Sequence, residues 1–182
     1  MATFGCSVKS ADELTNAPSL TIRSTRSSEP SALSSWARII NPHARAAAAP
    51  VAAYVPVIVA GPLAHVSGQL PFVDGKLVTG RLGEDVTLEQ GAAAARACGL
   101  MILAQLEAAL GSLDRVERIV KLGAFVNSNA RFSDQPKVAN GASELMVEVF
   151  GEAGKHARSA VGVPVLPLGA AVEVDAIVAV RP

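Results

Sequence analysis

The spacing of hydrophobic residues changes near residue 50 and divides the chain into two unlike parts. Residues 1–29 are rich in serine, threonine and alanine and show little apolar periodicity. From residue 51 onward, apolar positions recur with the period of two that is typical of strands or the period of 3.6 that is typical of helices. We therefore expect one folded domain at residues 51–182, preceded by an extension that lacks a packed core.

Several short apolar runs in the second part predict strands. Residues 56–61 and 63–68 lie on either side of a Gly-Pro pair and predict a hairpin. Asp74-Gly75 is the strongest two-residue turn signal in the chain. Residues 115–126 predict another strand. Residues 158–180 predict two more, which are separated by two prolines and are expected to be neighbours in the sheet.

Two longer segments have helical spacing. Residues 87–110 begin with Thr87 and Gln90 at capping-box spacing and end next to a glycine. Residues 134–150 begin with Asp134 as the expected cap and Pro136 in the first turn. Two helices among several strands are too few for a doubly wound sheet, so the pattern predicts an α+β fold with both helices on one face of one sheet.

The region before the domain gives weaker signals. Residues 30–50 predict a short helix followed by an alanine-rich linker. Residues 1–29 are expected to be a disordered or clone-derived extension, or part of a mitochondrial transit peptide covering residues 1–45. The basic residues and serines would suit a transit peptide, whereas Asp12, Glu13 and Glu29 argue against one. A cytoplasmic location is the expectation, with the mitochondrion as the alternative.

The composition excludes several functional classes. Sixteen basic and sixteen acidic residues cancel, and no basic stripe typical of nucleic-acid binding is present. The two cysteines match no zinc spacing, so neither a metal nor a disulfide framework is expected. The apolar helix at residues 87–110 is interrupted by Arg96, Gln105 and Glu107, which favours a core helix over a membrane span.

The C-terminal strand carries two carboxylates two positions apart, Glu173 and Asp175. Side chains alternate between the two faces of a strand, so the valines at even positions from Val172 are expected to face the helices. Glu173, Asp175 and Ile177 are then expected on the opposite face. That face is either solvated or, because apolar residues accompany the acids, covered by another copy of the chain.

The same C-terminal segment resembles the signature of the Rid family, also called the YjgF family, of enamine/imine deaminases. The matching residues are Arg158, Leu166-Pro167 and Val172-Glu173-Val174-Asp175, in register without a gap. Ser67-Gly68-Gln69-Leu70-Pro71 and Tyr54 match two further elements of the family. The resemblance covers about residues 50–182, and two motifs in register make it specific.

The resemblance implies both a fold and an activity. The fold would be a chorismate-mutase-like α+β domain that assembles into a homotrimer, with the open sheet faces forming a central barrel and clefts between subunits. The activity would be hydrolysis of reactive 2-imino or 2-enamino acids to 2-oxo acids and ammonia, without a cofactor. The expected partners are a small 2-imino or 2-oxo acid and two further copies of the chain, with neither nucleic acid nor membrane.

The resemblance also assigns roles to residues of this chain. Arg158 would hold the substrate carboxylate with two parallel hydrogen bonds. Asp175 would act as the acid–base group on the attacking water, with a side chain one methylene shorter than the family's glutamate. The remaining substrate-binding candidates are Ser67, Tyr54, Glu173 and Asn140. Ala160, where many relatives have cysteine, and the longer segment at residues 131–140 indicate a divergent subgroup.

Three classes of function remain open at the level of sequence. The first is an imine/enamine deaminase. The second is a trimeric binding protein that keeps the carboxylate pocket without useful turnover. The third, RNA cleavage, is the least favoured, because the net charge is zero and no cluster of aromatic and basic residues is present.

Overall fold

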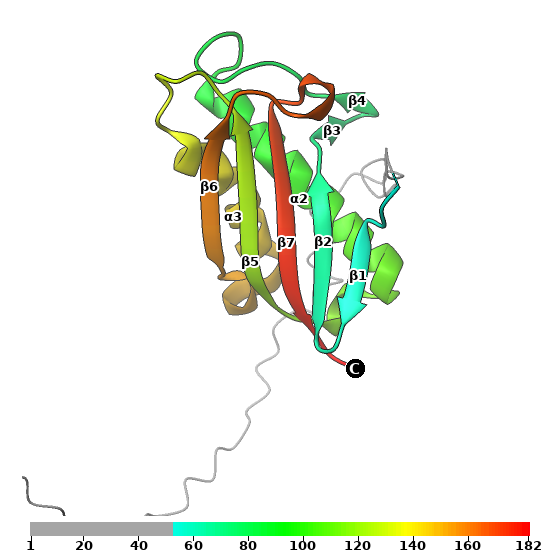
Figure 1. Ribbon diagram of the computed structural model, residues 1–182. Coiled ribbons are helices and arrows are strands. Elements are labelled where there is room, and N and C mark those ends of the chain that lie inside the picture. Colours follow the sequence, from blue (N-terminus) through cyan, green and yellow to red (C-terminus); the bar gives the residue numbers. More distant parts are fainter. Residues whose placement is uncertain (1–52) are drawn as a thin grey trace, which may run out of the picture.

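Five strands in the order β1–β2–β7–β5–β6 form the main sheet, as seen face-on in the computed structural model (Figure 1). The structure describes residues 53–182. The strands are β1 (Val57–Ala60), β2 (Leu63–Gln69), β5 (Val116–Asn127), β6 (Ala157–Val163) and β7 (Val172–Val180). Only β5 and β6 run parallel; the other neighbouring pairs are antiparallel. β3 (Phe72–Val73) and β4 (Lys76–Leu77) form a separate hairpin around the expected Asp74-Gly75 turn.

Two α-helices cover one face of this sheet and lie behind it in Figure 1. α2 (Leu88–Leu110) begins with the predicted capping box, in which Thr87 and Gln90 each bond to the other's backbone N–H. α3 (Gln135–Phe150) connects the parallel strands β5 and β6 and ends in a short 3-10 helix, η4 (Gly151–Gly154). The predicted α+β fold with both helices on one face is confirmed.

The core lies between the sheet and the two helices. The even-numbered residues of β7 face the helices and are buried: Val172, Val174, Ala176, Val178 and Val180. α2 is long and apolar enough to cross a membrane by length and composition, but 67% of its most apolar window is buried inside the domain. Burial of that kind identifies α2 as the core helix of the fold.

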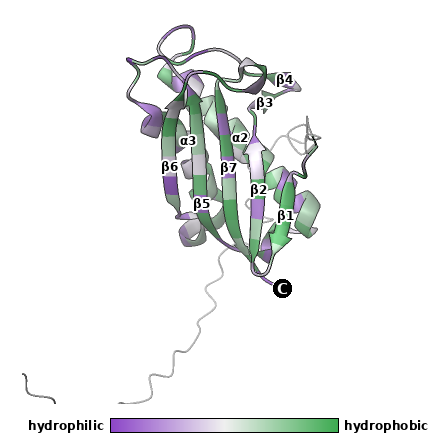
Figure 2. Cartoon of the chain, in the orientation of Figure 1, coloured by the Kyte–Doolittle hydropathy of each residue, from purple (hydrophilic) through white to green (hydrophobic). Residues whose placement is uncertain are grey.

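The other face of the sheet is not covered by any described element. Figure 2 shows largely hydrophobic strands interrupted by hydrophilic bands. Cross-strand register places Glu173 beside Phe125, Ile177 beside Lys121 and His65, and His65 beside Ile58. Ile58 is 58% exposed, and Val161 on the edge strand β6 is 46% exposed. We call this surface the open face; it mixes apolar side chains with the two carboxylates of β7.

Two details differ from the sequence analysis. The last two strands are consecutive in the chain but not neighbours in the sheet, because β5 lies between β6 and β7. Asp134 stands at the cap position of α3 without a side-chain cap bond; its carboxylate pairs with Lys137 at 3.0 Å. The short helix and linker expected at residues 30–50 and the extension at residues 1–29 lie outside the described residues.

Candidate functional site

The two carboxylates of β7 project from the open face but have different surroundings. Asp175 lies opposite Gly123 on β5, and its Oδ1 accepts a hydrogen bond of 2.9 Å from the Gly123 backbone N–H. A Cβ atom placed on Gly123 would lie 3.0 Å from Asp175 Cγ. The Asp175 side chain is thus folded back against β5 and held by the backbone.

Glu173 lies over the opposite neighbour, strand β2. The register between β2 and β7 shifts between Val66 and Gln69, which is a β-bulge, and the bulge contains Ser67 and Gly68. A Cβ atom on Gly68 would lie 2.7 Å from Glu173 Cδ, so the carboxyl group occupies the space that a side chain at position 68 would need. The glycine is therefore what allows the Glu173 carboxylate to lie against β2.

The surroundings of Glu173 favour its protonated form. Burial raises the pKa of the Glu173 carboxyl group above its usual 4.5, and the nearby negative charge of Asp175 raises it further. A raised pKa moves a carboxyl group toward the neutral range in which general acid–base groups work. The open face therefore carries one carboxylate anchored by the backbone and one whose pKa is raised.

Arg158 lies on the edge strand β6, and its guanidinium group is fixed by α3. Nη1 donates to Asn140 Oδ1 at 3.0 Å and to Ser143 Oγ at 2.8 Å, and Nη2 donates to the Pro136 carbonyl oxygen at 3.0 Å. A guanidinium group has five N–H donors. The Nε–H and one Nη2–H of Arg158 have no acceptor among the described residues. These two adjacent donors form a fork suited to a carboxylate.

Within one chain, Arg158 and the two carboxylates lie on opposite sides of the sheet. Arg158 pairs in register with Leu122, which is fully buried beneath the helices, whereas Asp175 pairs with Gly123 on the open face. Strand β5 also separates β6 from β7. A single chain therefore does not bring Arg158 and Asp175 together.

The other candidates are divided between these two places. Ser67 belongs to the bulge beside Glu173, and its hydroxyl donates to the Val55 carbonyl oxygen at 2.9 Å. That bond fastens the segment before β1 to β2. Tyr54, the residue before Val55, is 47% exposed. Asn140 instead lies on α3 and binds Arg158 directly.

Sequence reasoning missed two residues that belong to the surroundings of Arg158. Ser143 accepts from Arg158 and bonds to His156, which bonds in turn to the backbone of η4. These residues line an open groove of about 700 Å³ along α3 and the start of β6. The position of His156 two residues before Arg158 was visible in the sequence, but its link to Ser143 depends on how α3 packs.

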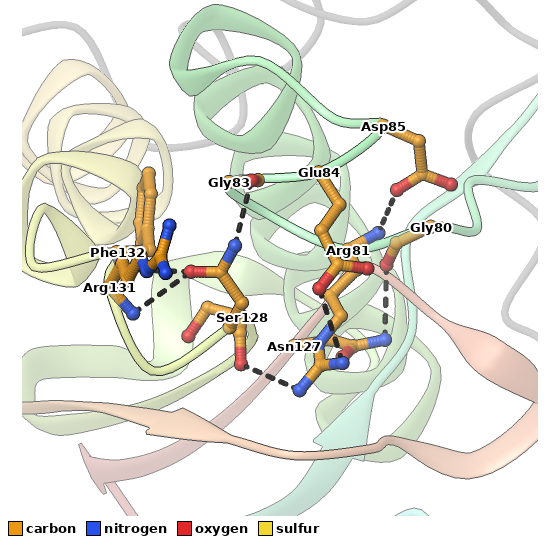
Figure 3. A network of polar contacts seen from close by, with 10 residues as sticks. Gly80, Arg81, Gly83, Glu84, Asp85, Asn127, Ser128, Arg131 and Phe132 are labelled. Atoms are coloured by element: carbon orange, nitrogen blue, oxygen red, sulfur yellow. Dashed lines mark hydrogen bonds and ion pairs between the residues drawn. The ribbon is translucent and has the colours of Figure 1, made fainter.

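A second, smaller cavity of about 360 Å³ lies at the ends of β5 and β6. Figure 3 shows the polar network at its rim, where the chain around Arg81 meets the end of β5. Arg81 pairs with Glu84 at 3.3 Å, and its Nη2 donates to the Ser128 carbonyl oxygen at 3.4 Å. Asn129 Oδ1 accepts from the backbone N–H of Arg131 and Phe132, both at 3.0 Å, and so stabilises the turn that follows β5.

The described residues contain no group of three or more His, Cys, Asp or Glu side chains that could hold a metal ion. Cys98 is buried in α2, and its thiol donates to the Val172 carbonyl oxygen at 3.6 Å. Burial raises the pKa of the Cys98 thiol, and the nearby Glu173 charge adds to the shift. A thiol in that environment is an inert part of the core.

Comparison with known proteins agrees with this geometry. Residues 39–179 match the family described as "YjgF/chorismate_mutase-like, putative endoribonuclease". The chain is also 58% identical over 135 residues to "Protein TCP17" of Trypanosoma cruzi, and the alignment covers 73% of this chain and 84% of that protein.

Solved structures show the same fold. Atu1372 of Agrobacterium tumefaciens, whose function is unknown, is 43% identical with a TM-score of 0.74, over 83% of this chain and 94% of that one. A "putative endoribonuclease" from Shewanella oneidensis is 35% identical with a TM-score of 0.78, over 82% and 99%. RidA from an Antarctic Psychrobacter is 29% identical with a TM-score of 0.53, over 75% and 95%. The match over most of the chain, together with the shared fold, shows that this chain belongs to the YjgF/chorismate-mutase-like family.

Proposed function

We propose that this protein hydrolyses reactive 2-imino and 2-enamino acids to 2-oxo acids and ammonia. The observation that carries the proposal is the Arg158 fork, which α3 holds in place with two N–H donors left over. A planar 2-imino acid presents a carboxylate that fits such a fork. The similarity to RidA and the family membership support the same reaction class.

The acid–base role belongs to Glu173 in this proposal, and not to Asp175 as the sequence analysis expected. Glu173 has the raised pKa and lies beside Ser67 and Gly68 of the bulge, where an added side chain would collide with it. Asp175 already accepts a backbone hydrogen bond from Gly123. Its neighbouring charge helps to raise the pKa of Glu173, so its role is electrostatic.

The reaction needs one water molecule and a group that moves protons. Water adds to the C=N carbon while the nitrogen gains a proton, which gives a tetrahedral carbinolamine. The C–N bond then breaks, ammonia leaves and the C=O bond forms. The Glu173 carboxylate takes a proton from the attacking water and passes it to the imine nitrogen, and it then moves the hydroxyl proton of the carbinolamine to the leaving amino group, so it is unchanged at the end of the cycle.

A site that uses both Arg158 and Glu173 needs more than one copy of the chain. Arg158 and Glu173 lie on opposite sides of the sheet, so a cleft that contains both would take Arg158 from one subunit and Glu173 from another. We propose a homotrimer in which the open faces are buried, because exposed apolar residues such as Ile58 and Val161 surround the carboxylates. The cleft would lie between the bulge of one subunit and the β6 edge of its neighbour.

A coupled assay tests the activity directly. A threonine dehydratase produces 2-iminobutyrate, and the release of 2-oxobutyrate is followed with and without this protein. The proposal predicts faster release with the wild type and little acceleration with Glu173→Gln, which retains the shape but cannot carry the proton. If the wild type leaves the rate unchanged but binds 2-oxobutyrate in an Arg158-dependent way, the protein is instead a carboxylate-binding protein without turnover.

A further inference from the structure

A chain of three hydrogen bonds connects the backbone of η4 to the guanidinium group of Arg158. His156 Nδ1 lies 2.6 Å from the Gly154 carbonyl oxygen, and His156 Nε2 lies 3.0 Å from Ser143 Oγ. Ser143 Oγ in turn accepts from Arg158 Nη1 at 2.8 Å. The four residues come from η4, the segment before β6, α3 and β6, so the chain ties the edge strand to the helix that packs on it.

The chemistry of the groups fixes the direction of these bonds. A carbonyl oxygen only accepts, so His156 Nδ1 must carry the proton that it shares with Gly154. In the neutral imidazole, Nε2 is then the acceptor, and the Ser143 hydroxyl must donate to it. The lone pairs of Ser143 Oγ are left for Arg158.

The far end of the chain is rigid. Gly154 is buried, and a Cβ atom at this position would lie 2.8 Å from Val147 Cα of α3, so only glycine lets η4 lie this close to the helix. The Gly154 carbonyl oxygen is therefore a fixed point relative to α3. Hydrogen bonds through His156 and Ser143 link Arg158 to this carbonyl oxygen. Asn140 supplies a second acceptor for the same Nη1.

We propose that Ser143 and His156 are positioning residues that orient the Arg158 fork for the substrate carboxylate. This inference rests on the proposed function for its kinetic consequence. The bonds that Arg158 donates to Asn140, Ser143 and Pro136 occupy three donors of the guanidinium group, and so leave Nε–H and the remaining Nη2–H as the pair that meets the ligand. A guanidinium group without these bonds would rotate, and its two free N–H groups would no longer be held in the orientation that meets the carboxylate.

A serine bonded to a histidine is also the arrangement of a nucleophilic hydrolase, but the position of Ser143 argues against that role. Ser143 lies in the middle of the 16-residue α3, where backbone N–H groups are used in helix hydrogen bonds. No free pair of N–H groups is therefore left beside it for an oxyanion. The hydroxyl serves Arg158 instead.

Two matched pairs of variants separate positioning from a general structural role. Ser143→Ala removes the acceptor, whereas Ser143→Thr keeps a hydroxyl. His156→Asn places an amide nitrogen near the position of Nδ1 and keeps the bond to Gly154, but it leaves Ser143 without an acceptor. His156→Gln reaches the position of Nε2 and can accept from Ser143, but it loses the bond to Gly154.

The kinetic expectation follows from the loss of one hydrogen bond to a charged group. Ser143→Ala should raise KM for 2-iminobutyrate and Kd for 2-oxobutyrate about tenfold, with kcat within about twofold, because carboxylate binding is common to ground state and transition state. Ser143→Thr should restore most of the affinity. His156→Asn should weaken binding more than His156→Gln. Equal values for Ser143→Ala and Ser143→Thr, or a larger effect of His156→Gln, would overturn the proposal.

A second readout does not depend on the proposed function. Arginine ¹H–¹⁵N NMR spectra, with Arg158 assigned by comparison with Arg158→Lys, report whether the guanidinium group rotates. Resolved Arg158 Nη–H signals should be present in the full-length wild type and in Ser143→Thr, and broadened in Ser143→Ala and His156→Asn. Signals that do not change among these variants refute the positioning role. If they change as expected while no imine hydrolysis is seen, the proposed function fails and the positioning role stands.

Discussion

Replacing Gly68 with alanine is expected to displace the Glu173 carboxylate without unfolding the sheet. The backbone of Gly68 has no positive φ, so alanine can adopt it without strain. The new Cβ atom would lie 2.7 Å from Glu173 Cδ and 3.0 Å from Cγ, whereas ordinary contact begins at 3.4 Å. The carboxyl carbon must therefore move by about 0.7 Å, and the oxygen that faces Gly68 must move farther.

A displacement of this size has a measurable cost only if the carboxylate takes part in the reaction. A misplacement of about 1 Å can cost ~10²-fold in rate, so Gly68→Ala should lower kcat for 2-iminobutyrate by roughly ten- to a hundredfold. KM should change little, because Arg158 holds the carboxylate elsewhere. The melting temperature should fall by no more than a few degrees, since Glu173 ends in a flexible and partly exposed group.

Gly123→Ala is the matched control, because it moves the other carboxylate. The new Cβ atom would lie 3.0 Å from Asp175 Cγ, which must shift by about 0.4 Å and lose its backbone bond. If Glu173 is the acid–base group, Gly123→Ala should keep kcat within about threefold of the wild type. A large loss in Gly123→Ala with normal activity in Gly68→Ala would assign the reaction to Asp175, and the reasoning from burial would be wrong.

The same geometry makes three further predictions. Glu173→Gln should abolish turnover and raise the melting temperature at neutral pH. A carboxyl group whose pKa is raised on folding lowers the stability of the protein as the pH rises above 4.5, so the gain from glutamine should vanish below that pH. A pH-independent difference would contradict the burial argument. Arg158→Lys should raise Kd for 2-oxobutyrate about ten- to a hundredfold in calorimetry, because an ammonium group has no fork; an unchanged Kd would remove Arg158 from the site. Light scattering at micromolar concentration should give three times the 18.6 kDa mass of one chain, and the mass of a monomer would exclude the proposed assembly.

Most of the fold could be predicted because local signals and packing agree. The Thr87–Gln90 capping box, the Asp74-Gly75 turn and the alternation of β7 each depend on residues close together in the sequence. The order of strands in the sheet was harder, because β5 inserts between β6 and β7 through the parallel crossover of α3. Asp134 lies at the predicted cap position of α3, but its carboxylate pairs with Lys137 and makes no cap bond, a choice between local partners that the sequence does not show.

The candidate site was harder to predict than the fold for a physical reason. The sequence shows that the side chains of β7 alternate between two faces, but not which neighbouring strand each carboxylate contacts. That choice depends on the bulge at Ser67-Gly68 and on the absence of a side chain at Gly123. Ser143 was missed because its partner is thirteen residues away across the α3–β6 connection. Arg158 and Asp175 could be matched to a motif, but only the register shows that they face opposite sides of the sheet.

The placement of Arg158 and Glu173 on opposite sides of the sheet allows a test of the assembly, in which subunits with different substitutions are mixed. If each cleft takes Arg158 from one subunit and Glu173 from another, a trimer formed from Arg158→Lys and Glu173→Gln subunits contains some clefts with both wild-type groups. Every trimer that contains both variants has one intact cleft in three, because only one junction of the ring takes Arg158 from a Glu173→Gln subunit and Glu173 from an Arg158→Lys subunit. Co-expression of the two variants, with a separate tag on each and two-step purification, should therefore give more activity than either variant has alone at a substrate concentration below the KM of Arg158→Lys. Mixing Glu173→Gln with Glu173→Ala is the control, because no cleft in such a trimer contains a wild-type Glu173. Recovery in that control, or none with Arg158→Lys, would show that the cleft is not shared between subunits in this way.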